Sequence, residues 1–307
     1  MFATEKQRIM IDVKIFILIF LFSSLSIQAQ TENKDCEKET KQWIERILRG
    51  FAEEGADGAQ YLQGNRYYSG DGVEQSYTEA VKWYRLSAEQ GYAPAQYMLG
   101  LCYLKGQGVE QSDTTAIKWF RLSAERGNAK AQCILGKCYK EGRGVEKSDT
   151  TAIRWFKLAA EQGVKEARQM VGMYYAYEKQ NFREAIEWFR PLAEQGDADA
   201  QAVLGFCLVK EHGAEHPYTE AVKWLKLAAE QGQAEGQFML GICYAKGYGV
   251  AKSFTEAVRW YRLSAQQGNA YAQYNLGICY KKGYGVPKSI SESVKWIKKS
   301  KLQKPSR

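Results

Sequence analysis

One stretch of about 15 residues recurs along the chain and constrains the fold more than any other feature. In most copies an alanine lies five residues before a glycine, and in five copies a Gly-x-Gly-Val turn follows. Periods of 20–50 residues are typical of solenoids, in which each repeat packs only on its neighbours. The repeated glycine occurs seven times, 36 residues apart except for one step of 33, at positions 64, 100, 136, 172, 205, 241 and 277.

A second motif follows each glycine at a fixed distance and carries the tryptophans. In residues 80–91 it reads Ala-Val-Lys-Trp-Tyr-Arg-Leu-Ser-Ala-Glu-Gln-Gly. Its small and apolar residues fall at i, i+3, i+4, i+7 and i+8, which predicts one buried face of a helix. Seven of the eight tryptophans recur in this register, and Trp43 lies in a leading half-repeat. Each repeat is therefore predicted to be helix A, a glycine-rich turn, helix B and a closing glycine.

Individual positions of the repeat have predictable local roles. Thr78 and its equivalents Thr219 and Thr255 are candidate N-caps of helix B. The closing glycines, such as Gly91, suit a helix end where φ is positive. The repeated glycine lies inside helix A, where glycine costs about 1 kcal/mol relative to alanine. We therefore expect it to let helix B approach closely.

The first 29 residues have the pattern of an export signal. A basic start leads into the apolar run 15–22, and small or polar residues follow as far as Ala29. This run is shorter than the roughly 20 residues that a membrane-spanning helix needs. We expect cleavage after Ala29 and export to the periplasm or the extracellular space, without membrane association of the cleaved protein. The alternative is an uncleaved N-terminal membrane anchor.

The rest of the chain divides into a leading segment, seven repeats and a short basic end. Residues 30–55 are predicted to form a linker and a capping helix, because their end repeats the end of helix B without a helix A before it. Residues 56–303 hold the seven repeats, and residues 304–307 form the basic end. The fourth and fifth repeats depart from the pattern, since both lack the Gly-x-Gly-Val turn.

The combined repeat resembles the Sel-one-like repeat (SLR), a relative of tetratricopeptide repeats. The residues that carry the resemblance are Ala-x-x-x-Leu-Gly-x-x-Tyr-x-x-Gly-x-Gly-Val followed by Ala-x-x-Trp-Tyr/Phe-x-x-Ala/Ser-Ala-x-x-Gly. They cover about four-fifths of the chain. The resemblance implies an all-α fold, an α/α superhelical solenoid of stacked helix-turn-helix repeats, that serves as an adaptor or scaffold for other proteins.

The distribution of charge argues against nucleic-acid binding. The formal net charge is +8, but residues from Ser293 onward carry +6 and residues 1–29 carry +1. Only +1 remains for the repeat array, whereas nucleic-acid-binding proteins carry a basic patch or stripe. We expect the basic end to be solvated and no nucleic acid to be bound.

Two groups of residues suggest chemistry that the repeat itself does not explain. His212 and His216, the only histidines, fit the H-x-x-E-H pattern of a zinc peptidase, but Gly213 interrupts the segment and the register places it in a loop. Five cysteines share one position of helix A, where a helix spacing of about 8–10 Å exceeds the reach of a disulfide. We expect a solvated loop at the histidines, buried thiols, and no metal or cofactor.

A peptide-binding surface is predicted on helix A. At about 100° per residue, positions −3, +1, +4 and +5 from the glycine share the arc opposite the core, which lines the concave surface in related solenoids. Aromatic and aliphatic residues edged by lysines are unusual on a surface that binds nothing. A superhelix tight enough to bury this arc against itself is the alternative. The predicted residues are Tyr97, Leu101, Lys105, Phe206, Lys210, Phe238, Ile242, Lys246, Tyr274, Ile278, Lys281 and Lys282.

The sequence therefore predicts an exported, monomeric, non-enzymatic scaffold that binds a protein or peptide of acidic character. Within the Sel-one-like repeat family, which the sequence resembles, a cysteine-rich branch is exported and associated with β-lactamase activity. This sequence lacks the paired cysteines of that branch, and it has neither Ser-x-x-Lys nor Gly-x-Ser-x-Gly. A β-lactamase-like or other cell-wall-directed hydrolase, or a glycan-binding module, remains the alternative.

Overall fold

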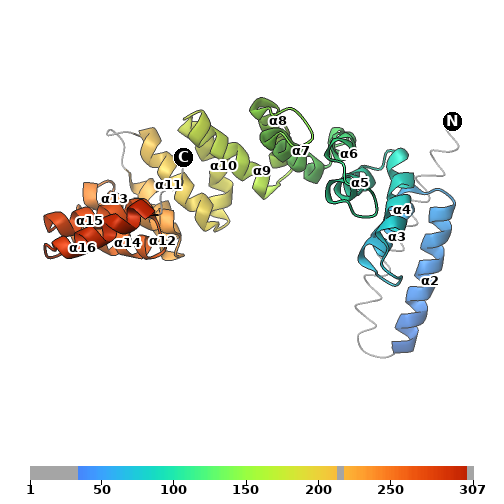
Figure 1. The fold of residues 1–307 in the computed structure, drawn as a ribbon, viewed down its shortest axis with the longest axis horizontal. Coiled ribbons are helices and arrows are strands. Elements are labelled where there is room, and N and C mark those ends of the chain that lie inside the picture. Colours follow the sequence, from blue (N-terminus) through green and yellow to red (C-terminus); the bar gives the residue numbers. More distant parts are fainter. Residues whose placement is uncertain (1–33, 213–217, 303–307) are drawn as a thin grey trace. The chain divides into compact units, whose positions relative to one another are not determined.

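Each repeat of the sequence folds into a pair of helices joined by a short turn (Figure 1). The computed structural model describes residues 34–212 and 218–302, and within these ranges it is helical without a strand. Helix B of one repeat packs on helix A of the next, so the pairs stack along the chain. The predicted all-α fold of stacked helix-turn-helix repeats is confirmed.

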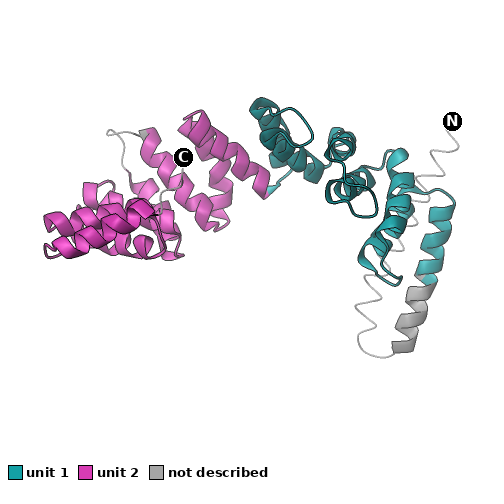
Figure 2. Ribbon diagram, viewed as in Figure 1, with its two compact units in different colours: residues 1–164 teal, residues 165–307 magenta. Residues whose placement is uncertain are grey.

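The chain forms two compact units, residues 1–164 and residues 165–307 (Figure 2). The helices of unit 1 are α2 (Lys34–Glu53), α3 (Asp57–Ser69), α4 (Tyr77–Glu89), α5 (Ala93–Lys105), α6 (Asp113–Glu125), α7 (Ala129–Glu141) and α8 (Asp149–Glu161). Those of unit 2 are α9 (Lys165–Met173), the π-helix η1 (Tyr174–Glu178), α10 (Phe182–Glu194), α11 (Ala198–His212), α12 (Thr219–Glu230), α13 (Ala234–Lys246), α14 (Phe254–Gln266), α15 (Ala270–Lys282) and α16 (Ile290–Leu302).

None of the threonines predicted as N-caps of helix B occupies that position, and at α4 and α14 the N-cap is a serine. Ser76 precedes α4 with extended backbone, and its hydroxyl accepts a hydrogen bond from the Glu79 amide. Ser253 does the same for the Glu256 amide at the start of α14. Because these helices begin earlier than predicted, the threonines lie in their first two positions. The prediction for Thr78, Thr219 and Thr255 is therefore wrong.

The repeated glycine of helix A has the packing role that the sequence predicts. A Cβ at Gly100 would lie 2.7 Å from the ring of Phe120 on the following helix B. The same close approach occurs at Gly136, where the ring belongs to Phe156. Real Cβ atoms do not tolerate such distances, so alanine here would force the two helices apart.

The core lies between helix B of one repeat and helix A of the next. In the cluster between α4 and α5, Val81 contributes from helix B, and Leu99 and Cys102 contribute from helix A. Their register equivalents form four further clusters along the chain. We call this set the apolar triad: a valine or isoleucine from helix B, and a leucine and a cysteine from the next helix A. The apolar triad recurs in the packing between repeats.

A buried glutamine in each regular repeat supplies hydrogen bonds across the same interface. Gln132 Nε2 donates to the carbonyl of Ala124 on the preceding helix B at 3.1 Å. Its Oε1 accepts from Gln162 Nε2, 30 residues later, at 2.8 Å. The glutamine side chain is thus hydrogen-bonded at both its donor and its acceptor, to the preceding helix B and to helix B of its own repeat. Such bonds hold the helices at a defined spacing.

The fourth repeat departs from the pattern where its sequence does. Without the Gly-x-Gly-Val turn, α9 is only 9 residues long and continues into the π-helix η1. The chain then turns at Gln180, whose φ of 51° makes it the one non-glycine residue with positive φ in the described ranges. The departure in structure therefore coincides with the departure in sequence, at the repeat that is three residues shorter.

The predicted export signal lies outside the residues that the structure describes. Among the described helices, none combines the length and the apolar character that a membrane crossing requires. The capping helix predicted within residues 30–55 corresponds in position to α2, which packs on α3.

Candidate functional site

The twelve residues predicted for the peptide-binding surface all lie on A helices. Three lie on α5 in unit 1, and the other nine lie on α11, α13 and α15 in unit 2. All five lysines are exposed, and among the apolar members Tyr274 is exposed while the others are half-buried. The lysines are therefore as exposed as the sequence predicts, whereas most of the apolar residues of the predicted surface are less exposed than predicted.

In unit 1, the two apolar residues pack beside helix B of their own repeat. Tyr97 lies with its ring centroid 6.0 Å from that of Phe120. Tyr97 and Leu101 both pack against the cluster between α6 and α7. Burial raises the pKa of Tyr97, because the phenolate loses its hydration there. Lys105, the last residue of α5, remains exposed beside them.

In unit 2, Phe206 is the centre of a small aromatic cluster. The ring of Tyr177, in η1, stacks on Phe206 at 5.9 Å, and Phe182 meets it edge to face at 6.0 Å. The ammonium group of Lys210 lies 5.7 Å from the centroid of the same ring. Phe206 is thus covered by its neighbours, and Tyr177 carries the exposed aromatic surface of this cluster.

The second aromatic group of unit 2 spans α13 and α15. Phe238 packs between Tyr261, at 6.1 Å, and Tyr271, which stacks on it at 6.0 Å. Tyr271 is 68% exposed and Tyr274 is 51% exposed, so the two tyrosines present their rings to solvent. Ile242 lies beside Phe238 and is half-buried against the same core.

The lysines of the surface lie at the carboxyl ends of their helices. Lys246 ends α13, and Lys281 and Lys282 end α15. None of the five lysines pairs with a carboxylate among the residues that the structure describes. A positive charge at the carboxyl end of a helix interacts favourably with the helix dipole and stabilises the helix by about 0.3–1 kcal/mol. This is a structural reason for a lysine at these positions. Their charge nevertheless remains available to an acidic ligand.

Sequence reasoning missed two of the exposed aromatic residues on this face. Tyr177 occupies the position where other repeats carry lysine, so its place on the arc was readable from the register. Tyr271 lies six residues before the glycine of its repeat, outside the predicted arc, and only the packing of its ring on Phe238 brings it to the surface strip. We call Phe238, Tyr271, Tyr274, Lys246, Lys281 and Lys282 the α13–α15 strip.

The cysteines are packing groups, as predicted. The five that share one position of helix A are free and buried. Burial raises the pKa of Cys102, Cys138 and Cys279 to about 11, and that of Cys207 and Cys243 to about 12. Thiols in such surroundings are poor nucleophiles and poor metal ligands at neutral pH.

The sequence predicts a solvated loop at the two histidines, and the structure describes only part of that segment. His212 is the last residue of α11, and His216 lies outside the described residues. Within the described ranges, no group of three or more histidine, cysteine, aspartate or glutamate side chains is arranged to hold a metal ion.

Known proteins resemble the chain at the level of both sequence and fold. A protective antigen present in uropathogenic Escherichia coli strains, which displays an SLR fold, is 36% identical and superposes with a TM-score of 0.70. The match covers 85% of this chain and 56% of the antigen, so the chain spans little more than half of that protein. A Sel1 repeat protein from Oxalobacter formigenes is 32% identical over 82% of this chain and 87% of its own, with a TM-score of 0.41. Comparison with curated proteins gives no match.

The family assignment follows from the repeats themselves. The Sel1 repeat matches seven times, at residues 58–92, 93–128, 129–164, 165–197, 198–233, 234–269 and 270–304. The matched span, 58–304, differs from the predicted span of 56–303 by at most two residues at either end. Since the matches together cover most of the sequence, the chain belongs to the Sel1 repeat family.

Proposed function

We propose that the protein is a monomeric, exported scaffold that binds an acidic peptide along the A-helix face of unit 2. Sel1 repeats are typical of protein–protein interaction scaffolds, and the family is generally non-enzymatic. The observation that carries the proposal is the α13–α15 strip, where two exposed tyrosines lie among three lysines without carboxylate partners in the described residues.

The chemistry of the strip suits a peptide that is both acidic and apolar. Tyr271 and Tyr274 offer wide, rigid contact area at a small cost in conformational entropy, as tyrosines do at binding hot spots. Lys246, Lys281 and Lys282 would meet acidic side chains and steer the peptide to the strip. The half-buried Phe238 supports the Tyr271 ring from beneath and so holds it in place.

Charge reversal on the strip tests this proposal. Acidic peptides that bind the full chain would be selected from a displayed library and measured by fluorescence anisotropy. The double variant Lys246→Glu, Lys282→Glu should weaken binding at least thirtyfold, because two attractive charges become repulsive. Both side chains are exposed, so the fold should be retained. The melting temperature should fall by only a few degrees, because a glutamate at the end of a helix interacts unfavourably with the helix dipole.

The matched control is the double variant Lys298→Glu, Lys301→Glu. These exposed lysines lie on α16, a B helix of the same unit, and the change in net charge is identical. This control should bind the selected peptides nearly as well as the unaltered protein. If both double variants bind equally well, or both lose binding equally, the lysines of the strip are bystanders and the proposed surface is wrong.

A further inference from the structure

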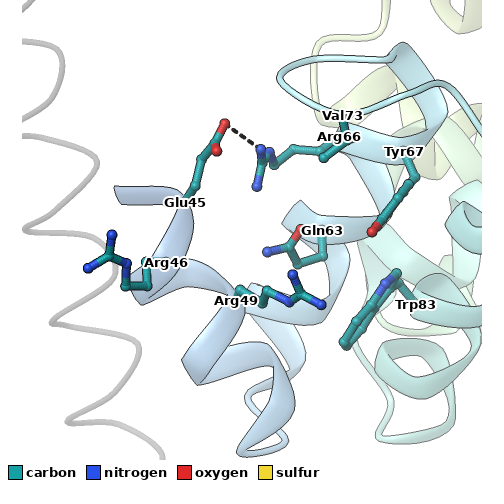
Figure 3. Close-up of a pocket in the computed structure, with 8 residues that line it drawn as sticks. All are labelled: Glu45, Arg46, Arg49, Gln63, Arg66, Tyr67, Val73 and Trp83. Atoms are coloured by element: carbon teal, nitrogen blue, oxygen red, sulfur yellow. Dashed lines mark hydrogen bonds and ion pairs between the residues drawn. The ribbon is translucent and has the colours of Figure 1, made fainter. Parts of the chain in front are cut away.

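A pocket of about 250 Å³ lies between the capping helix α2 and the first repeat. Figure 3 shows the guanidinium groups of Arg49 and Arg66 and the amide of Gln63 around one space, with the indole of Trp83 beside it. Glu45, on α2, forms an ion pair with Arg66, in which its Oε1 atom accepts a hydrogen bond from the guanidinium group at 2.5 Å. The pocket thus combines several hydrogen-bond donors, one acidic group and an aromatic wall, all within unit 1.

The repeat register shows that these polar residues replace the apolar triad. Between α4 and α5 the triad is Val81, Leu99 and Cys102. The residues 36 positions earlier, at the interface of α2 with α3, are Glu45, Gln63 and Arg66. A terminal cap needs polar residues on its outer face. These three instead occupy the positions that build the inner interface elsewhere in the array.

Gln63 gives an independent indication that the pocket takes a ligand. Its side chain is buried, with 3% exposure, and its Nε2 atom has no hydrogen-bond partner among the described residues. In Figure 3 this nitrogen points into the space between Arg49 and Arg66. A buried amide donor without a partner is unfavourable, and native proteins rarely keep one unless something else satisfies it.

The charges around the pocket favour a singly charged anion. Arg66 is largely buried, with 14% of its side chain exposed, and Glu45 already occupies part of its guanidinium. Arg49 lies on the other side, is 68% exposed and pairs through its Nε with Glu53 at 3.0 Å, which leaves its terminal nitrogens for a ligand. Arg46 points away from the space (Figure 3). A dianionic phosphate would be repelled by Glu45 more strongly than a carboxylate. A planar carboxylate also fits the fork of a guanidinium.

We propose that this pocket binds a carboxylate. Gln63 Nε2 and the guanidinium groups of Arg49 and Arg66 donate hydrogen bonds to its oxygens, and Trp83 packs against the carbon atoms next to it. The carboxylate belongs to a free organic acid or to an acidic side chain of a peptide. The pocket is independent of the α13–α15 strip, because all its residues precede Arg85 in unit 1.

Calorimetric titration of the full chain tests the pocket with defined probes. These are butyrate, a capped Ala-Glu-Ala tripeptide, its Ala-Gln-Ala counterpart and inorganic phosphate. We expect saturable binding of butyrate or of the glutamate tripeptide, at least tenfold tighter than binding of the glutamine tripeptide or phosphate. Binding of butyrate identifies a free acid as the source, and binding of the glutamate tripeptide alone identifies a peptide. Absence of saturable binding by both carboxylates, or tighter binding of phosphate, overturns the proposal.

Two variants test whether the named residues form the site. The triple variant Glu45→Val, Gln63→Leu, Arg66→Cys restores the apolar triad and should fold normally by circular dichroism while losing carboxylate binding at least tenfold. The single variant Arg49→Gln alters an exposed side chain and should weaken binding at least threefold. The double variant Lys246→Glu, Lys282→Glu should bind the same carboxylate unchanged. Binding that persists in both pocket variants would contradict the assignment, whatever becomes of the α13–α15 strip.

Discussion

Single residues decide how well neighbouring helices are joined. The buried glutamines at the repeat interfaces accept a hydrogen bond from the glutamine that caps the helix B 30 residues later. In the second repeat the capping residue of α6 is Arg126, and its side chain donates no hydrogen bond to Gln96 in this structure. The Oε1 atom of Gln96 is consequently buried without a hydrogen-bond partner. Arg126 therefore interrupts the series in the second repeat.

Restoring glutamine at this position should stabilise the protein. In the variant Arg126→Gln, the new amide can donate to Gln96 Oε1 as Gln162 donates to Gln132. We expect the free energy of unfolding of unit 1 to rise by about 1 kcal/mol, measured by urea denaturation. The variant Arg126→Leu removes the same charge without supplying a donor and is the control. A gain no larger in Arg126→Gln than in Arg126→Leu would show that the hydrogen bond does not form.

At the scale of the helix, the same few positions do the same work in every regular repeat. A glycine in helix A admits the ring or branched side chain of helix B, and the cysteine two residues later completes the apolar triad of the preceding interface. Because these cysteines lie inside the interface, burial raises their pKa well above the value of an ordinary thiol. The helices are thus packed through small and apolar groups that resist ionisation.

Ionisation of these thiols should destabilise the protein at high pH. Since the folded state raises the thiol pKa, it holds the thiol protons more tightly than the unfolded chain does. This contribution to stability is complete below the ordinary thiol pKa of about 8.5. It is lost as pH rises through the folded-state value of about 11 for Cys102, Cys138 and Cys279. Urea denaturation between pH 8 and pH 11 should therefore give a falling free energy of unfolding.

Alkylation provides the companion measurement for the same cysteines. At pH 8 without denaturant, iodoacetamide should modify the five buried cysteines at least a hundredfold more slowly than in urea, by mass spectrometry of the peptides. Equal rates in the two conditions would mean that the thiols are accessible and that their burial does not govern their chemistry.

The whole molecule is two compact units of one repeated design, with its excess charge toward the two ends of the sequence. Residues 1–29 and the residues from Ser293 onward account for most of the formal charge, so the array between them is nearly neutral. Stability in such arrays is approximately a sum of repeat terms and nearest-neighbour interface terms. Substitutions in unit 1 and in unit 2 can therefore be read separately, which keeps the tests of the two proposed sites distinct.

Export is the prediction that belongs to the whole molecule. The apolar run 15–22 and the small residues that follow it predict cleavage after Ala29. N-terminal sequencing of the protein recovered from the periplasm or the medium should therefore begin at or near Gln30. Recovery of the protein from membranes with Met1 intact would establish the uncleaved anchor instead.

The sequence by itself determined the period, the pairing of helix A with helix B and the reason for the glycine inside helix A. These features repeat seven times, so each position is supported by several copies, and local patterning suffices to assign it. It also placed the lysines on an exposed arc, because helical periodicity alone separates that arc from the core.

Only the tertiary structure decided how far neighbouring helices bury the side chains of the predicted peptide-binding surface. Tyr97 and Phe206 are half-buried because aromatic residues of adjacent elements pack on them, and helical periodicity within one repeat carries no information on those contacts. Whether Gln63 Nε2 finds a hydrogen-bond partner likewise depends on which residues of α2 lie across the interface. Such properties arise between segments far apart in the chain, where hydrogen bonds and cavities are set by packing and not by local pattern.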